Sequence, residues 1–246
     1  MIREIEGIIV STVDYKESSK IINIFTKDEG IIGVLARGSK RLKSNISASS
    51  NVLTYGVFHI RARNNGMGSL LDVDVINNFK YIKNDLLKIN YSCFLLELAS
   101  QVYRHDNDNN IYKLLIDSLK KINDGYDENV ITSIMELKML DYLGIRPVID
   151  KCVSCGNSDD IVTISSYKGG YLCKNCIGTE KVLNIKTLKL IRMFYYVDIS
   201  KISRIDISPN IMKEINNFID DYYDRYAGLY LKSKALLYDI KINNLT

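Results

Sequence analysis

Residues 152–176 have the sequence CVSCGNSDDIVTISSYKGGYLCKNC, and this stretch decides the fold of the second half of the chain. It contains two Cys-x-x-Cys pairs separated by 17 residues, formed by Cys152, Cys155, Cys173 and Cys176. Each pair brings two thiolates to one side of a tight turn, and the spacer suits a short hairpin that returns the second pair to the first. The four thiolates then complete the tetrahedral shell that zinc prefers. The spacing predicts a ribbon that holds one structural zinc ion.

The cysteine pairs have two alternative interpretations, a thioredoxin-like redox site and unligated core cysteines. A redox site needs one pair rather than two. A catalytic zinc is disfavoured because four protein thiolates leave no open position for water. The lack of a His-x-Glu sequence near the pairs argues against a nucleobase deaminase. Cys93 lies in an apolar segment outside the pairs and is expected to be a core residue.

The composition is that of a globular protein. Of the 246 residues, 46% are hydrophobic and 25% are charged, so the chain can bury a core without disulfides. Met1–Gly7 does not resemble a signal peptide, and no apolar run approaches the roughly 18–20 residues that span a bilayer. We therefore expect a cytoplasmic protein with no membrane segment, where paired thiols bind metal more often than they form disulfides.

The first 80 residues are predicted to form strands. Apolar and β-branched runs lie near residues 5–13, 21–25, 31–36, 52–62 and 70–76. Turn signals, Lys-Asp-Glu-Gly after the second run and Asn-Asn-Gly after the fourth, separate them. Five short strands in about 75 residues favour a small β-barrel or sandwich.

From about residue 81 the pattern changes to helices. Apolar residues recur at helical spacing, or fill longer breaker-free stretches, near residues 86–102, 111–122, 130–143, 186–196 and 211–226. The cysteine stretch, at about residues 150–180, interrupts these helices and is interpreted as an insertion that they carry. The predicted fold class is α+β, with a strand domain at residues 1–80 and a helical domain at residues 81–246.

One window of the N-terminal half contains no acidic residue. No Asp or Glu lies between Gly30 and Leu71. The basic residues considered there are Arg37, Lys40, Arg41, Lys43, Arg61 and Arg63. The first four are expected in one loop, and Arg61 and Arg63 are expected to point the same way because residues two apart on a strand share a face. This pattern fits either a positive groove that neutralises phosphates or a solvated loop that keeps the protein soluble.

The sequence shows no catalytic constellation. It contains no Walker-type loop, no carboxylate cluster with metal-ligand spacing and no Ser/His/Asp set. His59 and His105 are interpreted as structural residues. We therefore expect a protein that is not an enzyme.

Several segments, taken in order, resemble the RecO family of bacterial recombination mediators. They are the strand-rich N-terminus, ARGSKRLKS at residues 36–44, LGIRP at 143–147, CVSCG at 152–156 and GGYLCKNC at 169–176. The resemblance covers essentially the whole chain. The combination is specific, although each motif alone is not.

The resemblance implies an N-terminal OB-fold, a helical domain and a structural zinc ribbon. It implies a non-enzymatic mediator that binds single- and double-stranded DNA, anneals complementary strands and, with RecR, helps load RecA onto DNA coated by single-stranded-DNA-binding protein. Residues 37–43 take the position of the family's DNA-contacting loop. This position favours phosphate binding by the basic residues of the acid-free window. The acidic tail of single-stranded-DNA-binding protein, which ends in Phe, is expected to bind in an apolar pocket of the helical domain. Association with the nucleoid is expected when DNA is bound.

Two other functions remain as alternatives. One is a zinc-ribbon adaptor that docks proteins without binding DNA directly, and the other is a zinc-dependent hydrolase. Within the acid-free window only Tyr55 and Phe58 are aromatic, and the chain contains no Trp. This shortage favours contacts with the DNA backbone over base stacking.

Overall fold

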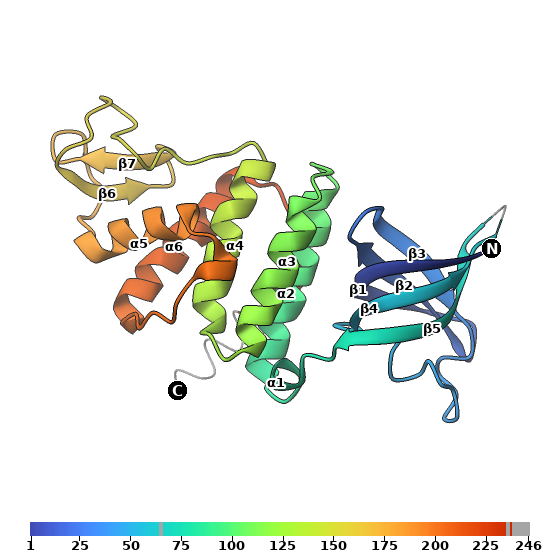
Figure 1. Ribbon diagram of the computed structural model, residues 1–246. Coiled ribbons are helices and arrows are strands. Elements are labelled where there is room, and N and C mark those ends of the chain that lie inside the picture. Colours follow the sequence, from blue (N-terminus) through green and yellow to red (C-terminus); the bar gives the residue numbers. More distant parts are fainter. Residues whose placement is uncertain (64–65, 235–236, 238–246) are drawn as a thin grey trace. The chain divides into compact units, whose positions relative to one another are not determined.

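The computed structural model describes residues 1–63, 66–234 and 237. The chain divides into two compact units, which are Met1–Asp124 together with the described residues from Lys232 onward, and Gly125–Leu231. The first unit holds a barrel of strands and the helices that follow it, and the second holds further helices and a short hairpin (Figure 1). None of the helices in the described part of the chain combines the length and apolarity needed to cross a membrane.

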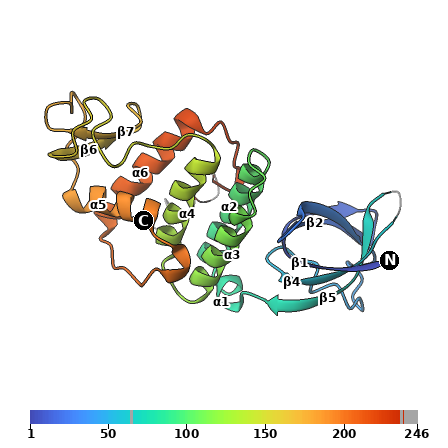
Figure 2. The same cartoon turned by 45° about the horizontal axis from the view of Figure 1, so that its top comes forward.

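Five strands form a closed barrel in the first unit. They are β1 (Ile2–Tyr15), β2 (Ser19–Thr26), β3 (Gly30–Ala36), β4 (Tyr55–Arg61) and β5 (Gly68–Asn77). Around the barrel the order is β1-β2-β3-β5-β4, with β3 parallel to β5 and the other neighbours antiparallel. Figure 2 shows the barrel strands from a second side. Five strands connected in this way make an OB-fold, and the predicted barrel is confirmed.

Alternation of apolar residues along the strands produces the barrel interior. Ile22, Val34 and Phe58 come from three different strands and are at most 1% exposed in one core cluster. Gly7 of β1 lies opposite Gly56 of β4. A Cβ on Gly7 or Gly56 would lie 2.8 or 2.5 Å from a carbonyl oxygen of the neighbouring strand. The close approach of β2 to Gly7 and of β5 to Gly56 therefore requires glycine at both positions.

Three helices complete the described secondary structure of the first unit: α1 (Lys80–Lys83), α2 (Leu86–Tyr103) and α3 (Asn110–Asn123). The side chain of Asp85 caps α2 by accepting hydrogen bonds from the first turn. Phe25 of β2 packs against Tyr103 of α2 and Tyr112 of α3, with ring centroids 4.8 and 5.5 Å away. These rings form an apolar contact between the barrel and the helices α2 and α3.

Three long helices pack on one another in the second unit: α4 (Glu128–Tyr142), α5 (Ile185–Tyr196) and α6 (Pro209–Tyr226). Their shared core includes Leu137, Phe194 and Ile215, which are fully buried. A two-stranded hairpin, β6 (Ile161–Ser165) and β7 (Gly170–Cys173), lies between α4 and α5 in the sequence, and a 3-10 turn (Ile199–Lys201) follows α5.

The five predicted helical segments are confirmed as α2 to α6. The predicted hairpin between the cysteine pairs is confirmed as β6 and β7. Cys93 is half-buried on α2, so its expected place in the core is wrong.

Candidate metal centre and nucleic-acid interface

The four paired cysteines lie together beside the hairpin. The sulfur atoms of Cys152, Cys155, Cys173 and Cys176 all lie within 4.8 Å of one another, and those of Cys155 and Cys173 are 3.7 Å apart. Four sulfurs at about 2.3 Å from one ion in a tetrahedron lie roughly 3.8 Å from each other. The cluster therefore fits one four-coordinate metal ion with a complete shell of thiolates.

Two tight turns bring the sulfurs together. In the first, the Gly156 N–H donates to the Cys152 carbonyl at 2.8 Å, and Gly156 has a φ of +77°, which favours glycine. In the second, the Cys176 N–H donates to the Cys173 carbonyl at 2.9 Å. Cys173 ends β7, and the N–H of Val153 in the first turn donates to the carbonyl of Tyr171 in the same strand at 2.8 Å.

The thiol pKa values show why the cluster suits a cation. Burial opposes ionisation of Cys152, but backbone amides, including that of Cys173, outweigh it and lower the pKa of Cys152 to about 6. Hydrogen bonding with the thiols of Cys155 and Cys173 raises the pKa of Cys176 to about 12. The Cys176 thiol therefore keeps its proton near neutral pH, whereas a coordinated cation would deprotonate it.

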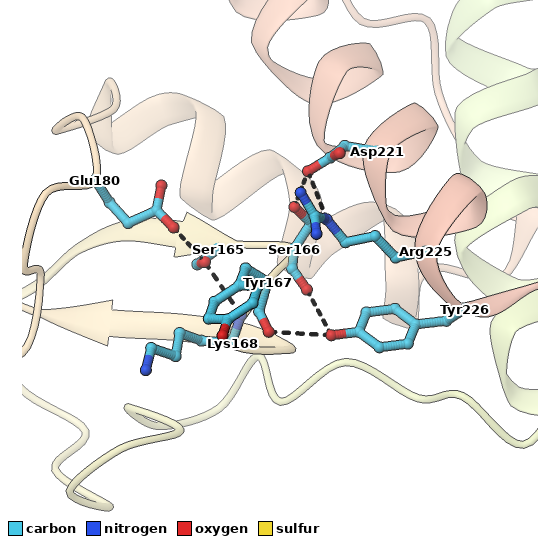
Figure 3. A network of polar contacts seen from close by, with 8 residues as sticks. All are labelled: Ser165, Ser166, Tyr167, Lys168, Glu180, Asp221, Arg225 and Tyr226. Carbon is cyan, nitrogen blue, oxygen red and sulfur yellow. Dashed lines mark hydrogen bonds and ion pairs between the residues drawn. The ribbon is translucent and has the colours of Figure 1, made fainter.

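The turn of the hairpin is fixed to α6 by a network of polar contacts (Figure 3). The Tyr226 hydroxyl donates to the carbonyls of Ser166 and Tyr167 at 2.9 and 3.1 Å. The carboxylate of Asp221 accepts from the Ser166 hydroxyl and, at 3.2 Å, from Nε of Arg225. These contacts lie at the end of the hairpin opposite Cys173.

The hairpin is also fixed to α5 and to the segment before it. The Tyr171 hydroxyl donates to the carbonyl of Leu188 on α5. The Thr163 hydroxyl donates to the carbonyl of Lys181 at 2.7 Å. The metal cluster therefore closes a ribbon whose other parts contact α5 and α6, an arrangement that suits a structural role.

The first four basic residues of the acid-free window are exposed on the loop that connects β3 with β4. Arg37, Lys40, Arg41 and Lys43 all lie near the start of this loop. The loop is held to the turn between β1 and β2, because the Lys40 N–H donates to the carbonyl of Ser18 at 3.0 Å. These four residues form what we call the basic loop.

Lys40 differs from the other three residues of the basic loop. Its Nζ lies 2.7 Å from a carboxylate oxygen of Asp14, at the end of β1. Hydrogen bonding and charge attraction from Lys40 lower the pKa of Asp14. Among the described residues, none forms an ion pair with Arg37, Arg41 or Lys43. Arg37, Arg41 and Lys43 are therefore more available than Lys40 to an anionic partner.

Two further lysines lie beside the basic loop in the structure but outside the acid-free window in the sequence. Lys16 lies in the turn between β1 and β2, and Lys20 lies at the start of β2, opposite Ala36 at the end of β3. Asp14 and Glu17 interrupt the sequence around them, so a search for acid-free stretches misses both lysines. Strand pairing brings them to the end of the barrel where the basic loop begins.

Arg61 and Arg63 do not share one strand. β4 ends at Arg61, so the predicted common direction of the two side chains, which depended on strand periodicity, does not extend to Arg63. Arg61 lies opposite Ser69 of β5, and Ser69 lies opposite Leu35 of β3. Two strand spacings, about 10 Å, therefore separate Arg61 from the end of β3.

Acidic side chains mark a different part of the barrel surface. His59 of β4 lies 2.7 Å from Asp74 of β5 and 3.6 Å from Glu4 of β1. Hydrogen bonding with Asp74 raises the pKa of His59. Phosphate binding is therefore better matched to the basic loop than to this group of side chains.

Comparison with known proteins matches nearly the whole chain. Residues 1–79 match the family model described as recombination protein O N terminal, and residues 83–235 match that described as recombination protein O C terminal. The chain is 36% identical over 241 residues to the DNA repair protein RecO of Halalkalibacterium halodurans, which covers 96% of this chain and 94% of that protein. It is 34% identical over 241 residues to the DNA repair protein RecO of Bacillus subtilis, with the same coverage. The DNA repair protein RecO of Listeria monocytogenes is 36% identical over 236 residues, 94% of this chain and 92% of that protein.

Proposed function

The chain belongs to the RecO family, as its motifs predicted, and from this premise we propose that it is a DNA-binding recombination mediator in DNA repair. In this role it anneals complementary strands and, with RecR, helps load RecA onto DNA coated by single-stranded-DNA-binding protein. It acts by binding and positioning DNA rather than by catalysis.

The basic loop is the observation that carries this proposal. Arg37, Arg41 and Lys43 are exposed, have no ion pair within the described residues and project from one loop of an OB-fold. Lysine and arginine side chains that neutralise phosphates release counterions, and this release drives sequence-independent DNA binding. We assign DNA contacts to the four residues of the basic loop and to Arg61 and Arg63. We add Lys16 on the adjoining turn and Lys20 at the start of β2.

Strand annealing tests the proposed function most directly. We expect the intact protein to accelerate pairing of two complementary oligonucleotides, one carrying a fluorophore and the other a quencher, and to lose this effect as salt is raised. A protein that docks partners without contacting DNA would leave the annealing rate unchanged. That result would favour the adaptor function over the mediator function.

We assign one structural zinc ion to the cysteine cluster. Thiolate ligands exclude calcium and magnesium, which take oxygen ligands, and two Cys-x-x-Cys turns with a complete tetrahedral shell are typical of structural zinc. Cys152, Cys155, Cys173 and Cys176 would hold the ion, which would stabilise the fold of the ribbon. A complete thiolate shell also argues against a zinc-dependent hydrolase.

A hollow of about 700 Å³ beside α5 is our candidate site for the acidic tail of single-stranded-DNA-binding protein. Leu190, Ile207 and Ile211 contribute apolar lining. Lys186 and Lys189 contribute two positive charges and Asp206 one negative charge, so the lining is positive on balance. An apolar terminal side chain can enter such a hollow while acidic neighbours pair with the lysines. The chemistry of the hollow thus matches the partner that the family resemblance implies.

Charge reversal at the hollow should weaken binding of such a tail. We expect Lys186→Glu combined with Lys189→Glu to reduce the affinity for a synthetic acidic, Phe-ended peptide on the order of tenfold or more, because two attractions become repulsions. Fluorescence anisotropy of the labelled peptide measures this change. Lys201→Glu with Lys213→Glu is a control of equal charge, and both of its lysines are also exposed. Equal affinity of the two double variants would place the tail elsewhere.

A further inference from the structure

The four thiols of the metal cluster differ in their exposure. Cys152 and Cys173 are buried, at 1% and 2% exposed, and Cys176 is half-buried. Cys155 is exposed and lies on an open turn, because residues 154–160 are all exposed as well. Oxidation of a cysteine depends on the access of the oxidant to its sulfur. A small oxidant in solution therefore reaches Cys155 before the other three thiols.

A second thiol lies within bonding reach of Cys155. Its sulfur is 3.7 Å from the sulfur of Cys173, and a disulfide bond is about 2 Å long. The two cysteines stay adjacent because the backbone hydrogen bond from Val153 to Tyr171 joins the first turn to β7. A combined movement of roughly 2 Å therefore joins the two sulfurs. The resulting disulfide would leave only two thiolates for a metal ion.

The ribbon also holds the start of α5. Two hydrogen bonds, of 3.1 and 2.7 Å, join β6 to residues 181–183, which precede this helix. The Tyr171 hydroxyl of β7 donates to the carbonyl of Leu188 within the helix. Lys186 and Lys189 lie on either side of Leu188 in the sequence and line the hollow beside α5. Loss of the ribbon fold would therefore release the turn that presents both lysines.

The basic loop does not depend on the ribbon for its fold. It belongs to the compact unit that contains Met1–Asp124, whereas the ribbon belongs to the unit Gly125–Leu231. The barrel that carries the basic loop has an apolar core of its own, which includes Ile22, Val34 and Phe58. A change in the ribbon can therefore alter the hollow and leave the basic loop in place.

We propose that the ribbon is a redox switch, in which a peroxide oxidises Cys155 and Cys173 to a disulfide with release of the metal ion, and the hollow beside α5 loses its acidic ligand while the basic loop still binds DNA. The proposal rests on the zinc site and the tail-binding hollow of the proposed function, and it adds regulation to them. Oxidation would separate partner binding from DNA binding.

The oxidation proceeds in two steps and consumes one molecule of hydrogen peroxide. The Cys155 thiolate attacks a peroxide oxygen, the O–O bond breaks, and a sulfenic acid and hydroxide form. The Cys173 thiolate then attacks the Cys155 sulfur, the S–O bond breaks, and a second hydroxide leaves. Two electrons pass from the sulfurs to the peroxide, and two protons from solvent convert both hydroxides to water.

Peroxide treatment of the zinc-loaded full chain tests the switch. Zinc release is followed with a coloured chelator, and the disulfide is mapped by mass spectrometry. Trypsin cleavage after Lys151, Lys168 and Lys174 places Cys173 on a different peptide from the other three paired cysteines. We expect release of one zinc ion for each link formed between peptides 152–168 and 169–174, and fragmentation should place the link at Cys155.

The same treated protein gives the functional result. Its affinity for the acidic, Phe-ended peptide should fall at least as far as in the Lys186→Glu, Lys189→Glu variant, and its affinity for DNA should stay at the untreated value. Reduction with dithiothreitol followed by added zinc should restore peptide binding. Treated protein that has lost its zinc but binds the peptide as before would overturn the coupling between the ribbon and the hollow.

Two variants test the role assigned to the exposed thiol. Cys155→His replaces it with an imidazole, a zinc ligand that cannot form a disulfide. Zinc that this variant holds should be released by peroxide far more slowly than from the wild type, whereas Cys93→Ser should respond like the wild type. Release from Cys155→His at the wild-type rate would overturn the switch.

The measurements distinguish failure of the switch from failure of the proposed function. Zinc that stays bound to the wild type under peroxide, with no link between the two peptides, would overturn the switch alone. Untreated protein without zinc would overturn the zinc assignment and the switch together. Untreated protein that does not bind DNA would overturn the DNA-binding function, and the zinc and disulfide measurements would still decide whether Cys155 and Cys173 respond to peroxide.

Discussion

Replacement of Cys155 with Ser is expected to reduce bound zinc from one ion per chain toward none and to destabilise the second compact unit. Cys155 is the exposed member of the cluster, so the substitution removes a ligand without placing a hydroxyl in a buried position. In small zinc domains the apparent binding free energy is about 10 kcal/mol or more, and this energy is also folding energy. A weaker three-thiolate site should therefore lower stability by several kcal/mol.

The measurement combines metal content with thermal unfolding. A loss of about 3 kcal/mol should lower the unfolding midpoint of a unit of this size by roughly 10 °C or more, and a chelator should have the same effect on the wild-type protein. Cys93→Ser is the matched control, because Cys93 lies on α2 outside the cluster. A Cys155→Ser protein with full zinc and wild-type stability would show that the cluster does not bind the ion as assigned.

X-ray absorption at the zinc edge adds a test of the role of the metal. Four sulfur neighbours and no oxygen neighbour are expected, because all four paired cysteines lie within one shell. Such a shell leaves no position for a water nucleophile. An exchangeable oxygen ligand would instead reopen the hydrolase alternative.

Local patterns were sufficient to predict most elements of the fold. The apolar stretch at residues 86–102 has no breaker and became α2, and the Cys-x-x-Cys spacing implied the hairpin of β6 and β7. These signals are strong because they arise from period, length and turn chemistry within a few residues. The short α1 and the 3-10 turn were not predicted, since one turn of helix carries little periodicity.

Contacts between distant strands could not be predicted in the same way. Lys16 and Lys20 join the basic loop only because β1, β2 and β3 pair in register. The same register places Tyr15 opposite Ser19, outside the window whose shortage of aromatic residues argued against base stacking. β4 ends at Arg61, so strand periodicity does not determine the direction of Arg63. Register and strand ends depend on barrel closure, a property of the whole domain rather than of one segment.

Replacement of Arg37, Lys40, Arg41 and Lys43 together by Ala is expected to weaken DNA binding roughly a hundred- to thousandfold near 0.1 M salt. Each phosphate contact contributes about 0.9 to the slope of log affinity against log salt. Lys40 is partly neutralised by Asp14, so the slope should fall by about 3 rather than 4. The loss should be similar for any sequence, because phosphates carry no sequence information. Binding isotherms at several salt concentrations give both quantities.

A control variant that loses the same number of charges elsewhere distinguishes the loss of a local DNA contact from the loss of overall positive charge. Lys113, Lys181, Lys201 and Lys213 are exposed lysines outside the barrel, and their replacement by Ala removes the same four positive charges. This control should retain most of the affinity and the slope. If both quadruple variants bound DNA equally well, the basic loop would not be the DNA contact.

Removal of the ion pair between Asp14 and Lys40 is expected to strengthen DNA binding, whereas the quadruple substitution weakens it. Asp14→Asn removes the carboxylate that holds Lys40 at 2.7 Å and leaves the amide in its place. Lys40 then becomes available to a phosphate, so affinity should rise roughly fivefold and the salt slope should steepen by up to about 1. In the background of Lys40→Ala, the same substitution should raise affinity less, because no cation is released. An equal gain in both backgrounds would mean that Asp14 acts through general repulsion of DNA and not through Lys40.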